Sequence, residues 1–121
     1  MKKILAFAAL FGMMMSAKAQ DSNWPQMDEF HHILAVVYHG WEANDKKPAY
    51  ERSGELAMKA KVLATSPIPA EKDSPEFRAL LADLAGKCSI FASFMSQNPD
   101  EEVAWEMLEE IHDLYHKIEE Q

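Results

Sequence analysis

Cysteine is nearly absent from this sequence, and its scarcity excludes one common means of stabilising a small exported domain. Cys88 is the only cysteine among 121 residues, so the chain cannot form an internal disulfide. Cys88 falls within an apolar stripe of helical spacing, and we expect it to be a small core residue. The stability of the fold must therefore come from packing.

Basic residues and catalytic motifs are also scarce. The chain has 12 Lys and Arg against 20 Asp and Glu, a formal net charge of −8. Such a surface repels phosphate backbones and anionic headgroups, so we expect neither nucleic acid nor membrane binding, but it attracts metal ions and basic partner proteins. No nucleophile elbow, phosphate loop or catalytic triad is present, and we do not expect an enzyme.

Long apolar runs are confined to the N-terminus, where residues 1–20 resemble a cleavable signal peptide. Lys2 and Lys3 form a basic segment, an apolar run from 4 to 15 follows, and Ala17-Lys18-Ala19 supplies the small-x-small cleavage pattern. Cleavage after Ala19 removes three lysines and moves the formal charge from −8 to −11. We expect a periplasmic protein with a mature domain at 21–121 and no membrane association after cleavage.

Four segments of the remaining chain have the apolar period of an α-helix. The first is expected to have Asn23 as its N-cap, with Gln26 completing a capping box, and Gly40 is expected to stop or bend it. The second spans about 48–64 and is rich in small residues. The third begins with Ser74 as cap and Pro75 in its first turn. The predicted core stripes are Met27, Phe30, Leu34, Val37 and Trp41, then Phe77, Leu80, Leu81, Leu84, Cys88, Phe91, Phe94 and Met95, then Ala104, Leu108, Ile111, Tyr115 and Ile118.

The fourth helix is expected to start with Asn98 as its cap, Pro99 at its first position and Glu101 completing a capping box. No strand-like alternation, internal repeat or second-domain linker is present. Short connections make successive helices antiparallel, so the sequence predicts one all-α domain, an up-down-up-down four-helix bundle.

All five histidines lie in two segments, 30–39 and 111–116, which belong to the first and last helices. In an up-down bundle these helices are neighbours, so His31 and His116 are expected to lie at similar heights across one seam, with His112 about one turn inward. Glu109 shares a side with the His112 and His116 pair, and His39 is a further candidate ligand. Imidazole and carboxylate donors suit zinc, copper, nickel or iron, so a transition-metal site is predicted.

Simpler explanations stand beside this one. Histidine pairs four residues apart often bridge core and solvent without binding anything. His32 and His39 share a side that points away from the apolar stripe, and we interpret both as solvated residues or as parts of an intermolecular site in a homodimer. Methionines on apolar faces are usually packing residues.

The predicted bundle with its proline-containing loop, the helix entry Asp73-Ser74-Pro75-Glu76 and the ending Leu114-Tyr115-His116-Lys117 resemble the soluble periplasmic b-type four-helix cytochromes. The resemblance implies a haem held by His116 and by a residue of the first helix, either Met27 or His31. The related cytochromes c′ share the architecture, but their Cys-x-x-Cys-His attachment motif is missing here, which excludes covalent haem.

Three functions follow from these observations. The first is a periplasmic metal-binding bundle for buffering, sensing or delivery. The second is a b-type haem electron carrier. The third is a cofactor-free structural or adaptor bundle, in which the histidines are scattered over a closed core.

Overall fold

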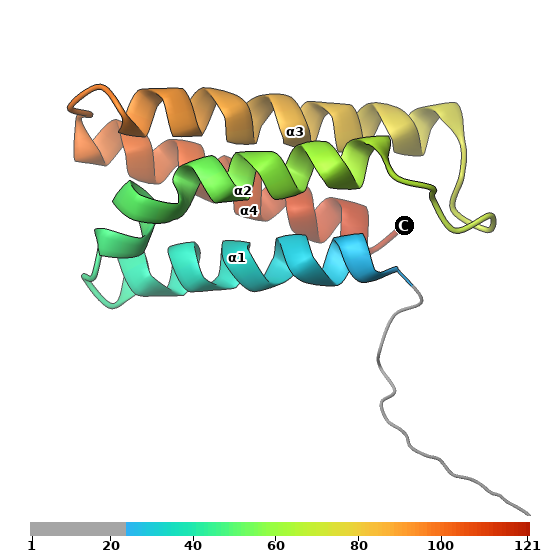
Figure 1. The fold of residues 1–121 in the computed structure, drawn as a ribbon, viewed down its shortest axis with the longest axis horizontal. Helices are drawn as coiled ribbons and strands as arrows, with labels where there is room; N and C mark the ends of the chain where they lie inside the picture. The colour runs from blue at the N-terminus through green and yellow to red at the C-terminus, as the bar shows by residue number, and fades with distance from the viewer. Residues whose placement is uncertain (1–23) are drawn as a thin grey trace, which may run out of the picture.

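The computed structural model describes residues 24–121, and these form four α-helices without a β-strand. The helices are α1 (Pro25–Glu42), α2 (Lys47–Thr65), α3 (Pro75–Met95) and α4 (Glu101–Glu119). They lie side by side, with the α1–α2 and α3–α4 connections at one end of the molecule and the α2–α3 connection at the other (Figure 1). The all-α prediction is confirmed for this part of the chain, whereas the expected signal peptide lies outside the described residues.

The N-cap residues of two helices, α1 and α4, differ from the sequence prediction, whereas that of α3 agrees with it. Ser74 caps α3 as predicted, since its hydroxyl accepts from the backbone N–H of Phe77 at 3.0 Å. Asn98 does not cap α4: it adopts a positive φ of 55°, which turns the chain, and Asp100 is the cap. The Asp100 carboxylate accepts from the two N–H groups of Glu102 and Val103.

The start and end of α1 also differ from the prediction. Trp24 occupies the N-cap position and provides no side-chain cap, and Asn23 lies outside the described residues. Gly40 does not stop the helix, which continues to Glu42. Asn44, with a φ of 65°, is in the left-handed region that reverses the chain toward α2.

The core is a single apolar cluster to which all four helices contribute. The predicted α4 stripe is confirmed, and the α3 stripe is confirmed except at Leu80 and Phe94, which are only partly buried. The α1 stripe is fully confirmed, and Cys88 is completely buried. Burial raises the pKa of the Cys88 thiol to about 12, so it is an inert core group. The largest fully buried side chains are Phe30, Phe91, Leu34, Leu56, Leu63, Leu81, Leu84, Leu108, Ile111 and Ile118.

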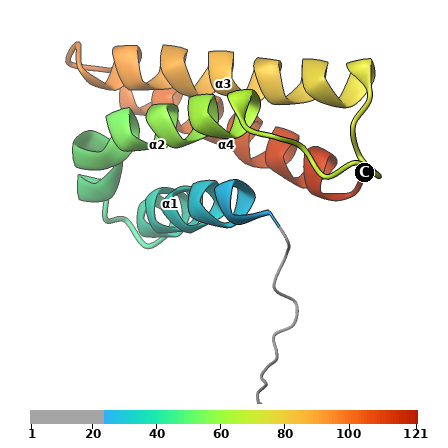
Figure 2. The ribbon, with the colours of Figure 1, turned by 45° about the vertical axis from the view of Figure 1, so that its right-hand side comes forward.

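The four helices do not pack equally closely. The backbones of α2 and α3 contact one another most extensively, while those of α1 and α4 share the least contact among the neighbouring pairs. Figure 2 shows the four helices from a second side. Aromatic rings and histidines fill the α1–α4 seam, including Tyr38 from α1 and Trp105 and Tyr115 from α4. Side chains of this size hold two helices apart, so the seam is where a site has room.

No helix among the described residues combines the length and the apolar character that crossing a membrane would require.

Candidate metal site between α1 and α4

Four of the five histidines surround one pocket at the α1–α4 seam. The pocket has a volume of about 290 Å³, and its lining consists of His31, Leu34, Ala35, His39, His112, Tyr115 and His116. The structure therefore brings together the three histidines of the predicted site. His39 also lines the pocket, and its side chain is exposed to solvent, as its position on the helical wheel predicted.

The two α4 histidines form the closest pair of potential ligands in this pocket. The Nε2 atoms of His112 and His116 lie 3.2 Å apart, and their rings are nearly perpendicular at 86°. Two nitrogens bound to one tetrahedral ion at about 2.05 Å lie about 3.3 Å from each other. The pair thus already has the nitrogen separation that a shared metal ion requires.

A carboxylate orients the His116 ring. Nδ1 of His116 lies 3.0 Å from Oε1 of Glu119, one turn further along α4. Because a carboxylate only accepts, Nδ1 carries the proton and the Nε2 lone pair points toward His112. When both rings are neutral, the N–H at Nε2 of His112 is then the donor to that lone pair. An outer carboxylate that fixes the ligand tautomer is typical of histidine metal sites.

His39 has the same arrangement on α1. Its Nδ1 lies 2.9 Å from Oε1 of Glu42, also three residues later, so its Nε2 is the nitrogen left for another partner. The His39 side chain is 68% exposed and that of His116 is 48% exposed. Both rings are therefore accessible to an ion arriving from solvent.

The electrostatics of the pocket favour neutral imidazole and incoming cations. Burial, with a further contribution from His116, lowers the pKa of His112, so this ring is neutral near pH 7. Burial also raises the pKa of Tyr38, and the carboxylates of Glu42, Glu109 and Asp113 raise it further. These acids surround the site with negative charge, which attracts metal cations.

Aromatic rings fix the remaining faces of the histidines. The ring of Tyr38 stacks on His112 with centroids 3.8 Å apart and planes 6° apart. The ring of Tyr115 stacks on His31 at 4.9 Å and 15°. Each contact joins α1 to α4, so the orientation of a histidine on one helix depends on the position of the other helix.

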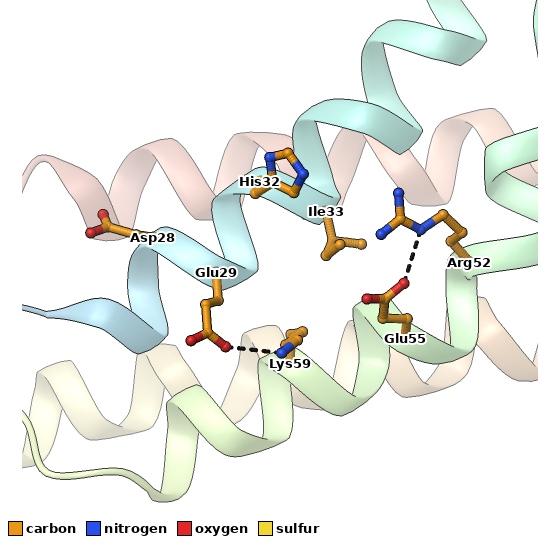
Figure 3. A pocket seen from close by; sticks show the side chains of 7 residues that line it. All are labelled: Asp28, Glu29, His32, Ile33, Arg52, Glu55 and Lys59. Atoms are coloured by element: carbon orange, nitrogen blue, oxygen red, sulfur yellow. Dashed lines mark hydrogen bonds and ion pairs between the residues drawn. The ribbon is translucent and has the colours of Figure 1, made fainter.

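Two predicted site residues, Met27 and Glu109, lie outside the pocket. Met27 is buried in the core and does not line the pocket, and Glu109 is exposed and acts on Tyr38 rather than lining the pocket. His32 lines a separate groove of about 350 Å³ between α1 and α2, where Glu29 pairs with Lys59 at 2.9 Å (Figure 3).

The donor set is incomplete before any ion arrives. Across residues 24–121, no group of three or more His, Cys, Asp or Glu side chains is already arranged to hold a metal. The α4 pair is thus a two-nitrogen chelate, and His31 and His39 of the same pocket are the nearest candidates for a third nitrogen. Water can fill the positions that remain.

The resemblance to b-type cytochromes implies a haem on His116, and the arrangement of these residues does not fit that group well. Nε2 of His116 is engaged with His112, and the ring of Tyr38 covers one face of His112 at 3.8 Å. A porphyrin would have to displace both side chains. A single ion would also have to replace the contact between the two Nε2 atoms, but it is far smaller than a porphyrin.

Comparisons with protein-family models, with curated proteins and with solved structures give no match, so neither the family nor the cytochrome resemblance is tested by them.

Proposed function

We propose that this protein is an exported, periplasmic four-helix bundle of up-down-up-down topology that binds one transition-metal ion for buffering, sensing or delivery. His112 and His116 are the primary ligands. The observation that carries the proposal is the 3.2 Å separation of their Nε2 atoms, supported by the Glu119 carboxylate on the outer nitrogen of His116. The leader-like residues 1–20 support export.

The donors define the class of ion. The pocket offers imidazole nitrogens with carboxylates close by, whereas Cys88 lies buried in the core and Met27 lies outside the lining. Without sulfur ligands the soft Cu(I) ion has little preference for this site. Imidazole suits the divalent ions of zinc, copper and nickel, and copper(II) binds such donors most tightly among them.

The test is a titration of tag-free mature protein with Zn²⁺, Cu²⁺ or Ni²⁺ at pH 7, followed by native mass spectrometry and calorimetry. We expect one ion per chain. His112→Ala and His116→Ala each remove a ligand and should abolish or severely weaken binding. Glu119→Gln removes the outer carboxylate and should weaken binding about tenfold to a hundredfold.

His32→Ala is the matched control, because His32 lies on the same helix as His31 but in the α1–α2 groove. This variant should bind like the unaltered protein. Binding that survives both α4 substitutions would contradict the assignment of ligands. A protein that takes up none of the three ions but binds haem would instead support the cytochrome hypothesis.

A further inference from the structure

We infer that Tyr38 is a positioning residue of the proposed metal site: its ring, through stacking rather than coordination, holds His112 with Nε2 directed at His116. The inference rests on the proposed function, which assigns His112 and His116 as ligands. Tyr38 lies on α1 and His112 on α4. A residue of one helix therefore fixes the ring orientation of a proposed ligand on the other helix.

The geometry of the contact is restrictive. The two ring planes are only 6° apart and their centroids are 3.8 Å apart, the shortest separation among the ring pairs within the described chain. On another side of the same imidazole, the ring of His116 meets it nearly edge-on at 4.4 Å. A rotation of His112 about its side-chain bonds would break the stacking contact and move Nε2 away from its partner.

Tyr38 is itself held in place by a column of rings. Trp105 of α4 also stacks on Tyr38, with centroids 5.1 Å apart, and Trp41 of α1 stacks on Trp105 at 6.0 Å. Trp41 is only 8% exposed, and the ammonium of Lys46 lies 5.5 Å from its ring centroid. The rings alternate between the two helices, so the column aligns α1 with α4 and ends at His112.

A pre-oriented ligand binds more tightly because less rotational freedom is lost when the ion arrives. Tyr38→Leu removes the stacking face but keeps an apolar side chain, and it should weaken Zn²⁺ binding about threefold to tenfold. Tyr38→Phe keeps the ring and should bind like the unaltered protein. Phe94→Leu controls for loss of a partly buried aromatic ring, since Phe94 packs against the core from α3.

The measurements are calorimetric Zn²⁺ titrations of the full mature chain together with NMR spectra of the metal-free protein. The face of Tyr38 should shift the ring protons of His112 upfield. That shift should disappear in Tyr38→Leu, persist in Tyr38→Phe and be unchanged in Phe94→Leu. This readout reports the ring orientation even if no ion binds, so it separates failure of the positioning role from failure of the proposed function.

Two results would overturn the inference. If Tyr38→Leu keeps both the upfield shift and the zinc affinity, the stacking contact does not position His112. If Tyr38→Phe loses affinity as strongly as Tyr38→Leu, the hydroxyl is the group that matters, and Tyr38 is a ligand rather than a positioning residue.

Discussion

His112 contributes both to the packing between α1 and α4 and to the proposed metal site. It is half-buried, stacked on Tyr38 and paired through Nε2 with His116. When both rings are neutral and His112 is the donor in this pair, binding an ion at its Nε2 requires that proton to move to Nδ1 or to leave. Metal binding and protonation therefore compete for the same nitrogen atoms.

That environment predicts a pH dependence of stability. Burial and His116 lower the pKa of His112 in the folded protein below the ordinary value of 6.5. Between that value and the lower folded pKa, the unfolded chain binds the proton and the folded chain does not. The free energy of unfolding therefore falls as pH decreases through this window, and the penalty is absent above it.

The measurement is urea unfolding of the metal-free protein at pH 7.5, 6.5 and 5.5. The unaltered protein should lose stability toward pH 5.5, and His112→Asn should flatten this dependence. His32→Asn is the control, because His32 is exposed in a different groove and should leave the slope unchanged. Equal slopes for all three proteins would contradict the assignment of the effect to His112.

At the scale of single residues, the sequence predicted which histidines share a pocket. It did not predict the side chains that orient those histidines. Helical period and antiparallel order place His31 and His116 on facing helices. The roles of Glu42 and Glu119 were missed, although the spacing His-x-x-Glu occurs at both His39 and His116. Tyr38 had no local signature, because a stacking partner on another helix depends on rotation and height that only packing determines.

The helices themselves contain glycines whose roles differ. Gly54 in α2 and Gly86 in α3 lie in helix interiors, and a Cβ added at either would meet nothing within 4 Å. In α1, a Cβ at Gly40 would lie 3.0 Å from the backbone oxygen of Asp45 and 3.3 Å from Pro48. Of these three glycines, only Gly40 is required by close approach of the chain.

Replacement by alanine should therefore have opposite effects. Gly54→Ala and Gly86→Ala should each stabilise the protein by about 0.5–1 kcal/mol, since alanine restricts the unfolded chain and favours helix. Gly40→Ala should destabilise it by about 1–3 kcal/mol, because the backbone that it meets has little freedom to move. Urea unfolding at constant m-value measures all three. A gain in stability at Gly40 would contradict the packing argument.

At the scale of elements, apolar period predicted the helices and their buried faces, whereas the caps were harder. Asn98, Pro99 and Asp100 are all residues typical of a helix start, and the sequence pattern alone favoured Asn98. The structure uses Asn98 for a left-handed turn, a conformation that asparagine tolerates well, and leaves capping to Asp100. The choice depends on the direction in which α4 must leave α3.

For the whole molecule, the unequal packing of the four helices would couple the proposed metal ion to stability. The α1–α4 seam has the least backbone contact, and its histidines come from both helices. An ion held only by His112 and His116 would act on α4 alone. An ion that is also coordinated by His31 or His39 would link α1 to α4.

We expect the second arrangement, because all four rings line one pocket. Zinc at about 100 times its dissociation constant should add about 2.7 kcal/mol of stability, which corresponds to a rise in Tm of roughly 10–20 °C for a domain of this size. Hydrogen exchange should show new protection in α1 around His31 and His39 as well as in α4.

The double variant His31→Ala, His39→Ala separates the two arrangements. It should still bind zinc through the α4 pair, but more weakly, and the added protection of α1 should be lost while that of α4 remains. Protection confined to α4 in the unaltered protein would show that the ion does not bridge the seam. In that case α1 would contribute Tyr38 to the site but no ligand.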